Sequence, residues 1–431
     1  MERYSEYKDS GIQWLGEIPS HWKLLKSKYL WRETIELSSK GKEELLSVSQ
    51  YTGVTKSQSD SRSESLKGYK IVHENELVIN IMLAWLGGLG VSEEEGIVSP
   101  AYCTYKLQKD YCPKFLHYLY KTPMYLAEFA RHSTGVVPSR WRMYSDDFGQ
   151  VISLIPPKSE QEAIVRYLDA ATSKIDKAIA MQQKMIDLLN ERKQIIIQKA
   201  VTKGLDENVE MKDSGVEWTK SIPSNWVVEP FVRHFTFGKG LPITKANLVE
   251  DGIAVISYGQ IHSKVNLGTT IADSLLRYVS PKYLGSHPQC LLKKDDFIFA
   301  DTSEDIEGSG NFAFNDYNEN VFAGYHTVIA RPIDLIFPKY YAYLFKSKAW
   351  KSQIQSLVNG VKVYSIGKRI LKTSSILIPT KSEQREIVDY LDRKTSAIEN
   401  SIDKISRQIT LLQERKQIII NEVVTGKVKV S

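Results

Sequence analysis

The strongest constraint on the fold of this chain is that its sequence repeats at long range. The segment Lys8–Trp22 returns as Lys212–Trp226, an offset of 204 residues (212 − 8), with 9 identities in 15 positions. A second block, Lys158–Thr202, returns as Lys381–Thr425, an offset of 223 residues (381 − 158), with 25 identities in 45 positions. Periods of this length are too long for a solenoid, so we predict a duplicated two-part module.

The longer repeat predicts a long helix in each copy. Both copies follow a proline and continue for about 40 residues without Pro or Gly, which gives a helix of about 60 Å. Ser159 and Ser382 are the expected N-caps, and Glu162 completes a capping box in the first copy. Apolar residues recur with heptad spacing, which predicts a narrow seam that needs a partner helix, and the other copy is the expected partner. The predicted seam, which we expect to serve the coiled coil and partner docking, comprises Leu168, Ile175, Ile179, Ile186, Leu189, Ile196, Leu391, Ile398, Ile402, Ile405, Ile409, Leu412 and Ile419.

The shorter repeat predicts a strap that follows each helix. Its large side chains, Trp14 and Trp22 in one copy and Trp218 and Trp226 in the other, are expected to anchor it in the core. The first helix leads directly into the second strap. The strap that would follow the second helix stands at the N-terminal end, so we expect a circular, pseudo-twofold arrangement with an antiparallel helix pair.

Between the repeats lie two segments that share little beyond their hydrophobic pattern. Both are predicted to mix strands and helices, with strands at 76–82 and 295–300 and helices at 113–120 and 338–348. The fold class is therefore α+β, with two mixed domains separated by two long antiparallel coiled-coil helices. The predicted boundaries are 1–23 for the first strap, 24–157 for the first variable domain, 158–227 for the central helix and strap, 228–378 for the second variable domain, and 379–431 for the distal helix.

The charge is nearly balanced, at 57 basic and 51 acidic residues, a formal net charge of +6. One stretch, between Asp334 and Glu383, has no acidic residue and holds nine cations. Tyrosines and a tryptophan are interleaved with these cations, namely Tyr340, Tyr341, Tyr343, Trp350 and Tyr364. This pattern is typical of a nucleic-acid surface, and it is equally typical of a solvated helix face.

The sequence offers no recognisable catalytic constellation. The three cysteines are far apart, the eight histidines are scattered, and neither a dinucleotide-binding nor a phosphate-binding glycine motif is present. The acidic residues of 301–307 are interpreted as a turn. We therefore expect a binding protein rather than an enzyme, with no metal and no bound cofactor. No apolar run is long enough to span a membrane and the start lacks a signal core, so a cytoplasmic location is expected.

The alternation of unlike domains with repeated helices resembles a known family. Each helix is led by Ile-Pro-x-x-Ser-Glu-Gln, and the straps read Asp-Ser-Gly-x-x-Trp followed by Ile-Pro-Ser-x-Trp. The whole chain is similar to the specificity subunit of Type I restriction–modification systems. The resemblance implies that each variable domain reads one half of a split, asymmetric site in double-stranded DNA. It also implies that the helices set the gap and, with the straps, dock two methyltransferase subunits that carry S-adenosylmethionine, and that restriction–translocation subunits join this complex.

Base reading requires side chains that donate and accept hydrogen bonds, and phosphate contacts require cations. Loops rich in such residues are the candidates in each domain. The predicted DNA-binding residues are Lys56, Ser57, Gln58, Arg62, Arg140 and Arg142 in the first domain, and Lys239, Lys264, Asn311, Lys362, Tyr364, Lys368 and Arg369 in the second.

Other functions remain open at this point. The chain has the features of a recognition subunit of another split-site methylating nuclease, which belongs to the same class. A coiled-coil adaptor that joins proteins without DNA would show the same helices. An enzyme with an unrecognised site would need a cleft with perturbed titratable groups.

Overall fold

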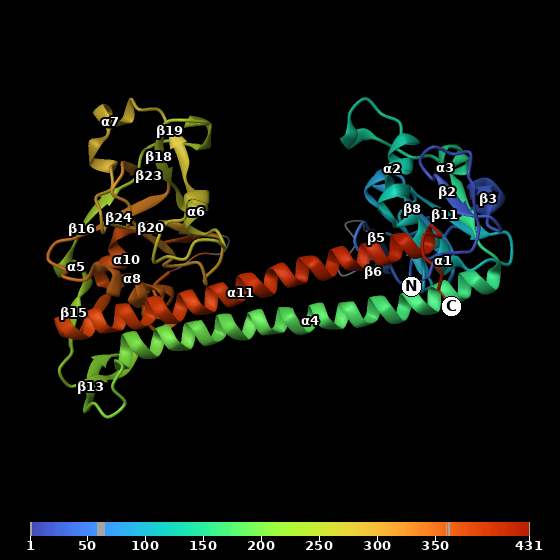
Figure 1. Cartoon of the computed structure of the whole chain (residues 1–431). Coiled ribbons are helices and arrows are strands. Elements are labelled where there is room, and N and C mark those ends of the chain that lie inside the picture. Colours follow the sequence, from blue (N-terminus) through green and yellow to red (C-terminus); the bar gives the residue numbers. More distant parts are fainter. Residues whose placement is uncertain (1, 58–64, 359, 361–362, 431) are drawn as a thin grey trace. The chain divides into compact units, whose positions relative to one another are not determined.

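The computed structural model describes residues 2–57, 65–358, 360 and 363–430. By its internal contacts the chain divides into two compact units (Figure 1). Unit 1 comprises Met1–Gln183 together with Ser406–Ser431, and unit 2 comprises Lys184–Ile405. Unit 1 is thus assembled from two segments that are distant in sequence, whereas unit 2 is one continuous segment.

Two long helices dominate the structure, and each unit holds a part of both (Figure 1). They are α4 (Lys158–Lys203) and α11 (Lys381–Val424), and each is continuous over its whole range. Their first residues follow β12 (Ile152–Ile155) and β26 (Ser375–Ile378), so the predicted boundaries at 157 and 378 coincide with strand–helix junctions. The contact-based division falls instead inside both helices.

Polar contacts define the direction of the helix pair. In unit 1, Lys416 of α11 lies 2.7 Å from Asp176 of α4. Six residues further along α4, Gln182 donates to Gln408, which lies eight residues earlier in α11. The contacts therefore advance along one helix as they retreat along the other, and the pair is antiparallel.

The apolar seam predicted from the heptad spacing is covered in both units. Leu168 and Leu391 are fully buried, and the remaining members of the seam are buried or half-buried. In unit 2 the seam is flanked by an ion pair between Lys193 and Glu399, whose charged atoms lie 3.5 Å apart. The prediction of two paired coiled-coil helices is confirmed.

The predicted caps of these helices are wrong, because both helices begin one residue before Ser159 and Ser382. In α11 the cap is Thr380. Its backbone N–H donates to Glu383 Oε2 at 3.1 Å, and the N–H of Glu383 donates to Thr380 Oγ1 at 3.4 Å. This is a capping box that starts at the threonine, which the sequence analysis passed over in favour of the serine two residues later.

Unit 1 is built around an antiparallel sheet in the order β4-β11-β8-β9. The sheet strands are β4 (Trp31–Thr34), β11 (Tyr102–Leu107), β8 (Leu77–Asn80) and β9 (Leu89–Val91). Three helices follow, α1 (Pro113–Tyr120), α2 (Pro123–Arg131) and α3 (Ser145–Gln150), before β12 pairs with β3 (Lys23–Lys26). Two further pairs are β5 (Leu46–Ser49) with β6 (Gly53–Lys56), and β7 (Lys70–Val72) with β10 (Gly96–Val98).

Unit 2 repeats this plan with an insertion. Its main sheet has the order β16-β24-β20-β22, from β16 (Phe235–Lys239), β24 (Thr327–Pro332), β20 (Phe297–Ala300) and β22 (Phe312–Phe314). It is followed by α8 (Pro338–Lys346), α9 (Lys348–Gln355) and α10 (Lys368–Thr373), and then β26 pairs with β15 (Val227–Pro230). The insertion is a second sheet, β17 (Leu248–Val249), β19 (Arg277–Val279), β18 (Ile253–Ile256) and β23 (Val321–Ala323). Short elements complete the unit, namely α5 (Phe231–His234), α6 (Tyr258–Ile261), α7 (Tyr283–Ser286), β21 (Thr302–Ser303) and β25 (Tyr364–Ser365).

Each strap is a two-stranded hairpin, β1 (Tyr7–Asp9) with β2 (Glu17–Pro19) in unit 1 and β13 (Met211–Val216) with β14 (Thr219–Pro223) in unit 2. A hydrogen bond of the same kind fastens each strap to the first turn of a long helix. Trp22 Nε1 donates to Glu160 Oε1, and Trp226 Nε1 donates to Glu383 Oε1, each at 3.1 Å. Both indoles are fully buried, as predicted.

The strap of unit 1 closes onto the end of α11. The Tyr7 hydroxyl donates to the carbonyl of Gly426 at 3.0 Å, and the N–H of Lys429 donates to the carbonyl of Glu2 at 2.8 Å. In unit 2 the end of α4 meets its strap directly along the chain. Gly426 and Gly204 end the two helices with the same φ of +75°, the left-handed conformation that favours glycine. The predicted circular connection, in which the first strap completes the end of the second helix, is confirmed.

Glu383→Gln is expected to lower the free energy of unfolding by about 1–2 kcal/mol, because an amide oxygen accepts weaker hydrogen bonds than a carboxylate. The measurement is urea denaturation of the full chain at neutral pH. Glu386→Gln is the matched control, since Glu386 is exposed and lies one turn further along the same helix. An equal loss in both variants would assign the effect to charge at the helix terminus rather than to the strap.

The effect of Glu383→Gln should also depend on pH. Although burial acts in the opposite direction, hydrogen bonds from Thr380, Trp226 and Asn225 lower the pKa of Glu383 from its ordinary value of 4.5. The unfolded chain therefore takes up this proton first, so the stabilisation is complete above the unfolded pKa and is lost as pH falls through the lower folded value. The difference in stability between wild type and Glu383→Gln should shrink below pH 4.5. A difference that stays constant on acidification would contradict this assignment.

Candidate nucleic-acid interface

In unit 2 the structure brings predicted cations together at one end of the main sheet. Lys239 ends β16, and Lys368 and Arg369 begin α10. Burial, together with repulsion from Lys239 and Lys372, lowers the pKa of Lys368, whose ammonium lies 3.5 Å from the carbonyl of Phe237. Lys368 is thus repelled by Lys239 and Lys372, and a group of cations of this kind is suited to binding a phosphate.

The interpretation of the interleaved aromatic residues as part of a nucleic-acid surface is wrong for four of the five. Tyr340, Tyr341, Tyr343 and Trp350 are at most 2% exposed and belong to the hydrophobic core of unit 2. The reason is that α8 and α9 turn these side chains inward, where the Tyr340 hydroxyl donates to the carbonyl of Val201 in α4 and the Tyr343 hydroxyl donates to Asp392 in α11. Tyr364 differs, since it lies half-buried in β25.

Two lysines of the same basic stretch also point into the domain. Lys346 donates to the carbonyl of Leu267 at 2.6 Å, and Lys351 donates to Asn311 Oδ1 at 2.5 Å. Burial lowers the pKa of both lysines to about 8. These two cations therefore hold loops inside the domain rather than facing solvent.

In unit 1 the predicted residues fall in two places. Lys56, at the end of β6, is exposed and lies 3.8 Å from Glu94, and Ser57 follows it. Gln58 and Arg62 lie outside the described residues, as does Lys362 in unit 2. Arg140 and Arg142 lie on the loop between α2 and α3. Arg140 is exposed, whereas Arg142 is half-buried and donates from Nη1 to the carbonyl of Trp141 at 2.8 Å.

The remaining predicted residues of unit 2 are not equivalent. Lys264 is exposed. The amide of Asn311 is engaged inside the domain, since Oδ1 accepts from Lys351 and Nδ2 donates to His262 Nδ1 at 3.1 Å. Tyr364 pairs with Ser303 between β25 and β21. Asn311 and Tyr364 therefore both lie beside the loop 301–311. Asn311 stabilises this loop through its hydrogen bonds to Lys351 and His262.

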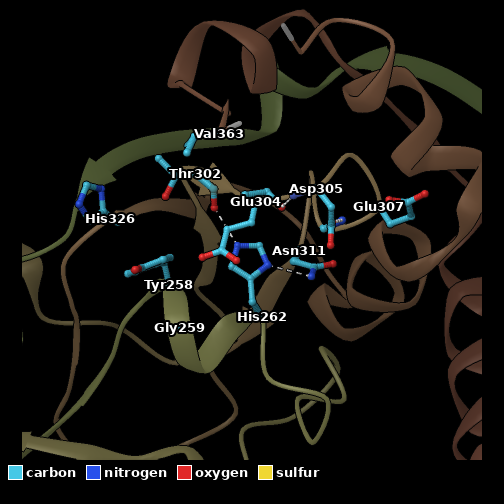
Figure 2. A pocket seen from close by; sticks show the side chains of 12 residues that line it. Tyr258, Gly259, His262, Thr302, Glu304, Asp305, Glu307, Asn311, His326 and Val363 are labelled. Atoms are coloured by element: carbon cyan, nitrogen blue, oxygen red, sulfur yellow. Dashed lines mark hydrogen bonds between the residues drawn. The ribbon is translucent and has the colours of Figure 1, made fainter. Parts of the chain in front are cut away.

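A polar pocket of about 730 Å³ lies in this region of unit 2 (Figure 2). His262 forms part of its floor, where Nε2 donates to the carbonyl of Thr302 at 2.7 Å, which leaves Nδ1 to accept from Asn311. Lys351, Asn311 and His262 thus form a hydrogen-bonded chain with one direction. The other side chains of the pocket include Tyr258, Glu304, Asp305, Glu307 and His326.

This pocket was not predicted from the sequence, in which the histidines are scattered and the acidic run 301–307 is typical of a turn. The pocket exists because β21 pairs with β25 and because His262 and His326 approach from two other segments. Each of these contacts joins residues far apart in the chain, and no local spacing in the sequence indicates them.

The long helices also expose apolar side chains that the seam does not use. Leu188 and Ile195 of α4 are 51% and 60% exposed, and Leu411 and Ile418 of α11 are 62% and 55% exposed. The two pairs are related by the repeat offset of 223 residues (411 − 188). Residues seven apart lie on one face of a helix, so each unit presents the same apolar pair to solvent.

No group of three or more His, Cys, Asp or Glu side chains in the described part of the chain is arranged to hold a metal ion. No helix among the described residues is long and apolar enough to cross a membrane.

Residues 235–410 match the Methylase_S family model, which describes the Type I restriction modification DNA specificity domain. The chain is 24% identical over 281 residues to the Type I restriction enzyme MjaVIII specificity subunit of Methanocaldococcus jannaschii, a match that covers 64% of this chain and 62% of that protein. It is 23% identical over 209 residues to the EcoKI specificity subunit of Escherichia coli, covering 48% of this chain and 44% of that protein. The matches thus span less than two thirds of the length of either relative.

A solved chain from a study of complex assembly and conformational transition of the type I R-M system has the same fold. It aligns over 95% of this chain and 99% of its own length, with a TM-score of 0.68 and 13% identity. The resemblance inferred from the repeated motifs is therefore confirmed at the level of the fold.

Proposed function

We propose that the chain is the DNA-recognition subunit of a Type I restriction–modification complex, because residues 235–410 match the model of the Type I restriction modification DNA specificity domain. Each unit reads one half of a bipartite, asymmetric site in double-stranded DNA. The observation that carries the proposal is the repetition of one framework with different loops. The strand order and the strap contact recur in both units, whereas the exposed side chains differ. A split, asymmetric site requires two domains that share a framework and differ in the residues that contact the bases.

The repeated helices support two further parts of the proposal. They set the number of base pairs between the half-sites, and they dock two copies of one methyltransferase subunit. The exposed pairs Leu188–Ile195 and Leu411–Ile418 are candidates for docking because they recur at equivalent positions, as two copies of one partner require. The seam residues are covered inside the chain and are less suited to this role.

The chain contributes recognition and no catalysis in this proposal. S-adenosylmethionine binds to the methyltransferase subunit, which modifies adenine at N6, and restriction–translocation subunits complete the assembly. The cation group at Lys239, Lys368 and Lys372 supports DNA binding. A DNA phosphate bound there would relieve the repulsion that Lys368 experiences from the other two lysines.

A map of N6-methyladenine across a bacterial genome tests this function. The chain is expressed with a Type I methyltransferase subunit that binds it, and the control is the methyltransferase alone. We expect a split motif with a fixed gap only when both are present. Identical maps in the two samples would reject DNA recognition by this chain and favour a protein-joining coiled coil. A split motif that is cleaved by the methyltransferase polypeptide itself would indicate another class of split-site nuclease.

Four residues inserted in both helices should lengthen the gap without changing either half-site. Insertion between Gln183 and Lys184 and between Ile405 and Ser406 leaves the contacts inside each unit intact. Four residues add about 6 Å of helix, which corresponds to one or two base pairs at about 3.4 Å each. The same insertion in the turn at 206–208 is the control. Altered half-site letters with an unchanged gap would reject the role of the helices as spacer.

Replacing the exposed leucines should remove methyltransferase copies one at a time. Leu188→Asp or Leu411→Asp is expected to leave a complex with one copy, and the double variant a complex with none, because a charge prevents burial of the apolar face. Native mass spectrometry of the purified complex counts the copies. Val265→Asp is the control, since Val265 is 56% exposed but lies outside the helices. Two copies retained in the double variant would place docking elsewhere.

A further inference from the structure

The two units share a contact between two loops. In each unit, the loop that follows one inner strand of the main sheet, β8 in unit 1 and β20 in unit 2, is hydrogen-bonded to a second loop. In unit 1 the N–H of Met143 donates to the carbonyl of Ile81 at 3.0 Å, and in unit 2 the N–H of Ile366 donates to the carbonyl of Asp301 at 2.7 Å. Met143 and Ile366 are both buried, at 1% and 0% exposed. We name this place the loop junction. It comprises 81–88 with 134–143 in unit 1, and 301–311 with 363–366 in unit 2.

Each loop junction is held from inside by a half-buried lysine. In unit 1, Lys121 donates to the carbonyls of Gly87 and Gln50, at 2.7 and 2.9 Å. In unit 2, Lys351 donates to Asn311 Oδ1. Burial lowers the pKa of Lys121 and of Lys351 to about 8. These hydrogen bonds tie the base of each loop to the domain beneath it.

On this common base, unit 1 presents an apolar and cationic surface. Thr134 and Arg142 exchange two backbone hydrogen bonds of 2.9 Å, which closes the loop. At its tip Val136 is 95% exposed and Val137 is 44% exposed, and Arg140 follows in the same loop. Behind the tip, the rings of Trp141 and Trp85 pack edge to face at 5.3 Å. A rigid loop therefore holds two valines and an arginine out in solvent.

Unit 2 presents the opposite chemistry at the equivalent place. Its loop junction borders the polar pocket, and Glu304 and Asp305 are exposed at the rim (Figure 2). Tyr258 and His326 form another side of the pocket, with ring centroids 5.3 Å apart. Among the described side chains available for contact there, the charged groups are carboxylates, which only accept hydrogen bonds, and Ile306 and Val363 are exposed apolar groups.

We propose that the loop junction is the base-reading surface of each unit, with Val136 and Arg140 reading the first half-site and Glu304 and Asp305 reading the second. This inference rests on the proposed function. Its support is that the frame is the same in the two units while the exposed chemistry is different. Readers of two different sequences need the same approach to the groove and different groups at the base edges.

The chemistry of the exposed groups identifies the bases. A guanidinium donates two hydrogen bonds to guanine O6 and N7, and an apolar side chain contacts the 5-methyl group of thymine. Carboxylates only accept hydrogen bonds and are repelled by phosphates, so in a DNA interface they face the exocyclic amino group of cytosine or adenine. The first half-site is therefore expected to contain guanine and thymine at the positions that unit 1 contacts, and the second to contain an amino-bearing base opposite Glu304 and Asp305.

The test compares methylation motifs of variants made in the full chain and expressed with the methyltransferase subunit. Arg140→Ala and Val136→Ala should relax letters of the first half-site only. Glu304→Gln and Asp305→Asn should relax letters of the second half-site only. For the purified complex, each change should weaken binding of the cognate duplex about 5- to 150-fold, the loss of one specific base contact.

Matched controls lie at the other end of the same sheets. Arg32 is the second residue of β4 and pairs with Lys106, at the end remote from the unit 1 loop junction. Glu319 is exposed in the turn after β22, whose other end adjoins Asn311. Arg32→Ala and Glu319→Gln should leave both half-sites and the affinity unchanged.

A second readout addresses the thymine contact. Replacing thymine by uracil in the first half-site removes the 5-methyl group alone. Wild type should lose affinity at one or more of these positions, and Val136→Ala should show no further loss there. Equal sensitivity to uracil in wild type and variant would remove Val136 from the interface.

The outcomes separate the inference from the function on which it rests. If the wild-type chain yields no split motif, the proposed function fails, and the inference fails with it because it rests on that function. If the wild type yields a split motif and the four variants keep every letter and their affinity, the function stands and the loop junction is overturned as the reading surface. Relaxed letters in the wrong half-site would overturn the assignment of residues to half-sites.

Discussion

The whole structure depends on the exclusion of water from the seam between α4 and α11. Each helix carries a stripe of leucine and isoleucine that is too narrow to be stable alone in water, and each is covered by the other. Because both helices contribute to both units, each unit is completed by the seam. The strap hydrogen bonds from Trp22 and Trp226 then fix where the globular part begins, since their acceptors lie in the first turn of a helix.

Repetition of this frame allows the loops to diverge. The loops rest on the sheet, on the inward-facing aromatic residues of α8 and α9 and on the half-buried lysines. None of these depends on which side chains the loops expose to solvent. Lys121 and Lys351 show this separation most clearly. Each supports a loop whose exposed charged side chains differ from those of the other unit, arginine in unit 1 and carboxylates in unit 2.

The sequence was informative wherever structure is local or repeated. Heptad spacing predicted both helices, and the position of Trp22 and Trp226 predicted buried anchors, because these signals lie within a few turns of chain. The aromatic residues around Trp350 were misread, since periodicity alone does not tell which face of a short helix meets the sheet. The pocket at His262 was missed because strand pairing and approaches from distant segments create it. The predicted cap Ser382 failed for a smaller reason, namely that Thr380 offered an equivalent hydroxyl two residues earlier.

The closure of the first strap onto the end of α11 has a consequence for synthesis on the ribosome. Unit 2 is a single stretch and has all its residues once position 405 has emerged. Unit 1 waits for 406–431, so its first 183 residues leave the ribosome without the helix segment that covers their half of the seam. Domains usually fold in the order in which they are made. Here the order is reversed, and unit 1 is completed after unit 2, with its apolar stripe open to chaperones until 406–431 have emerged.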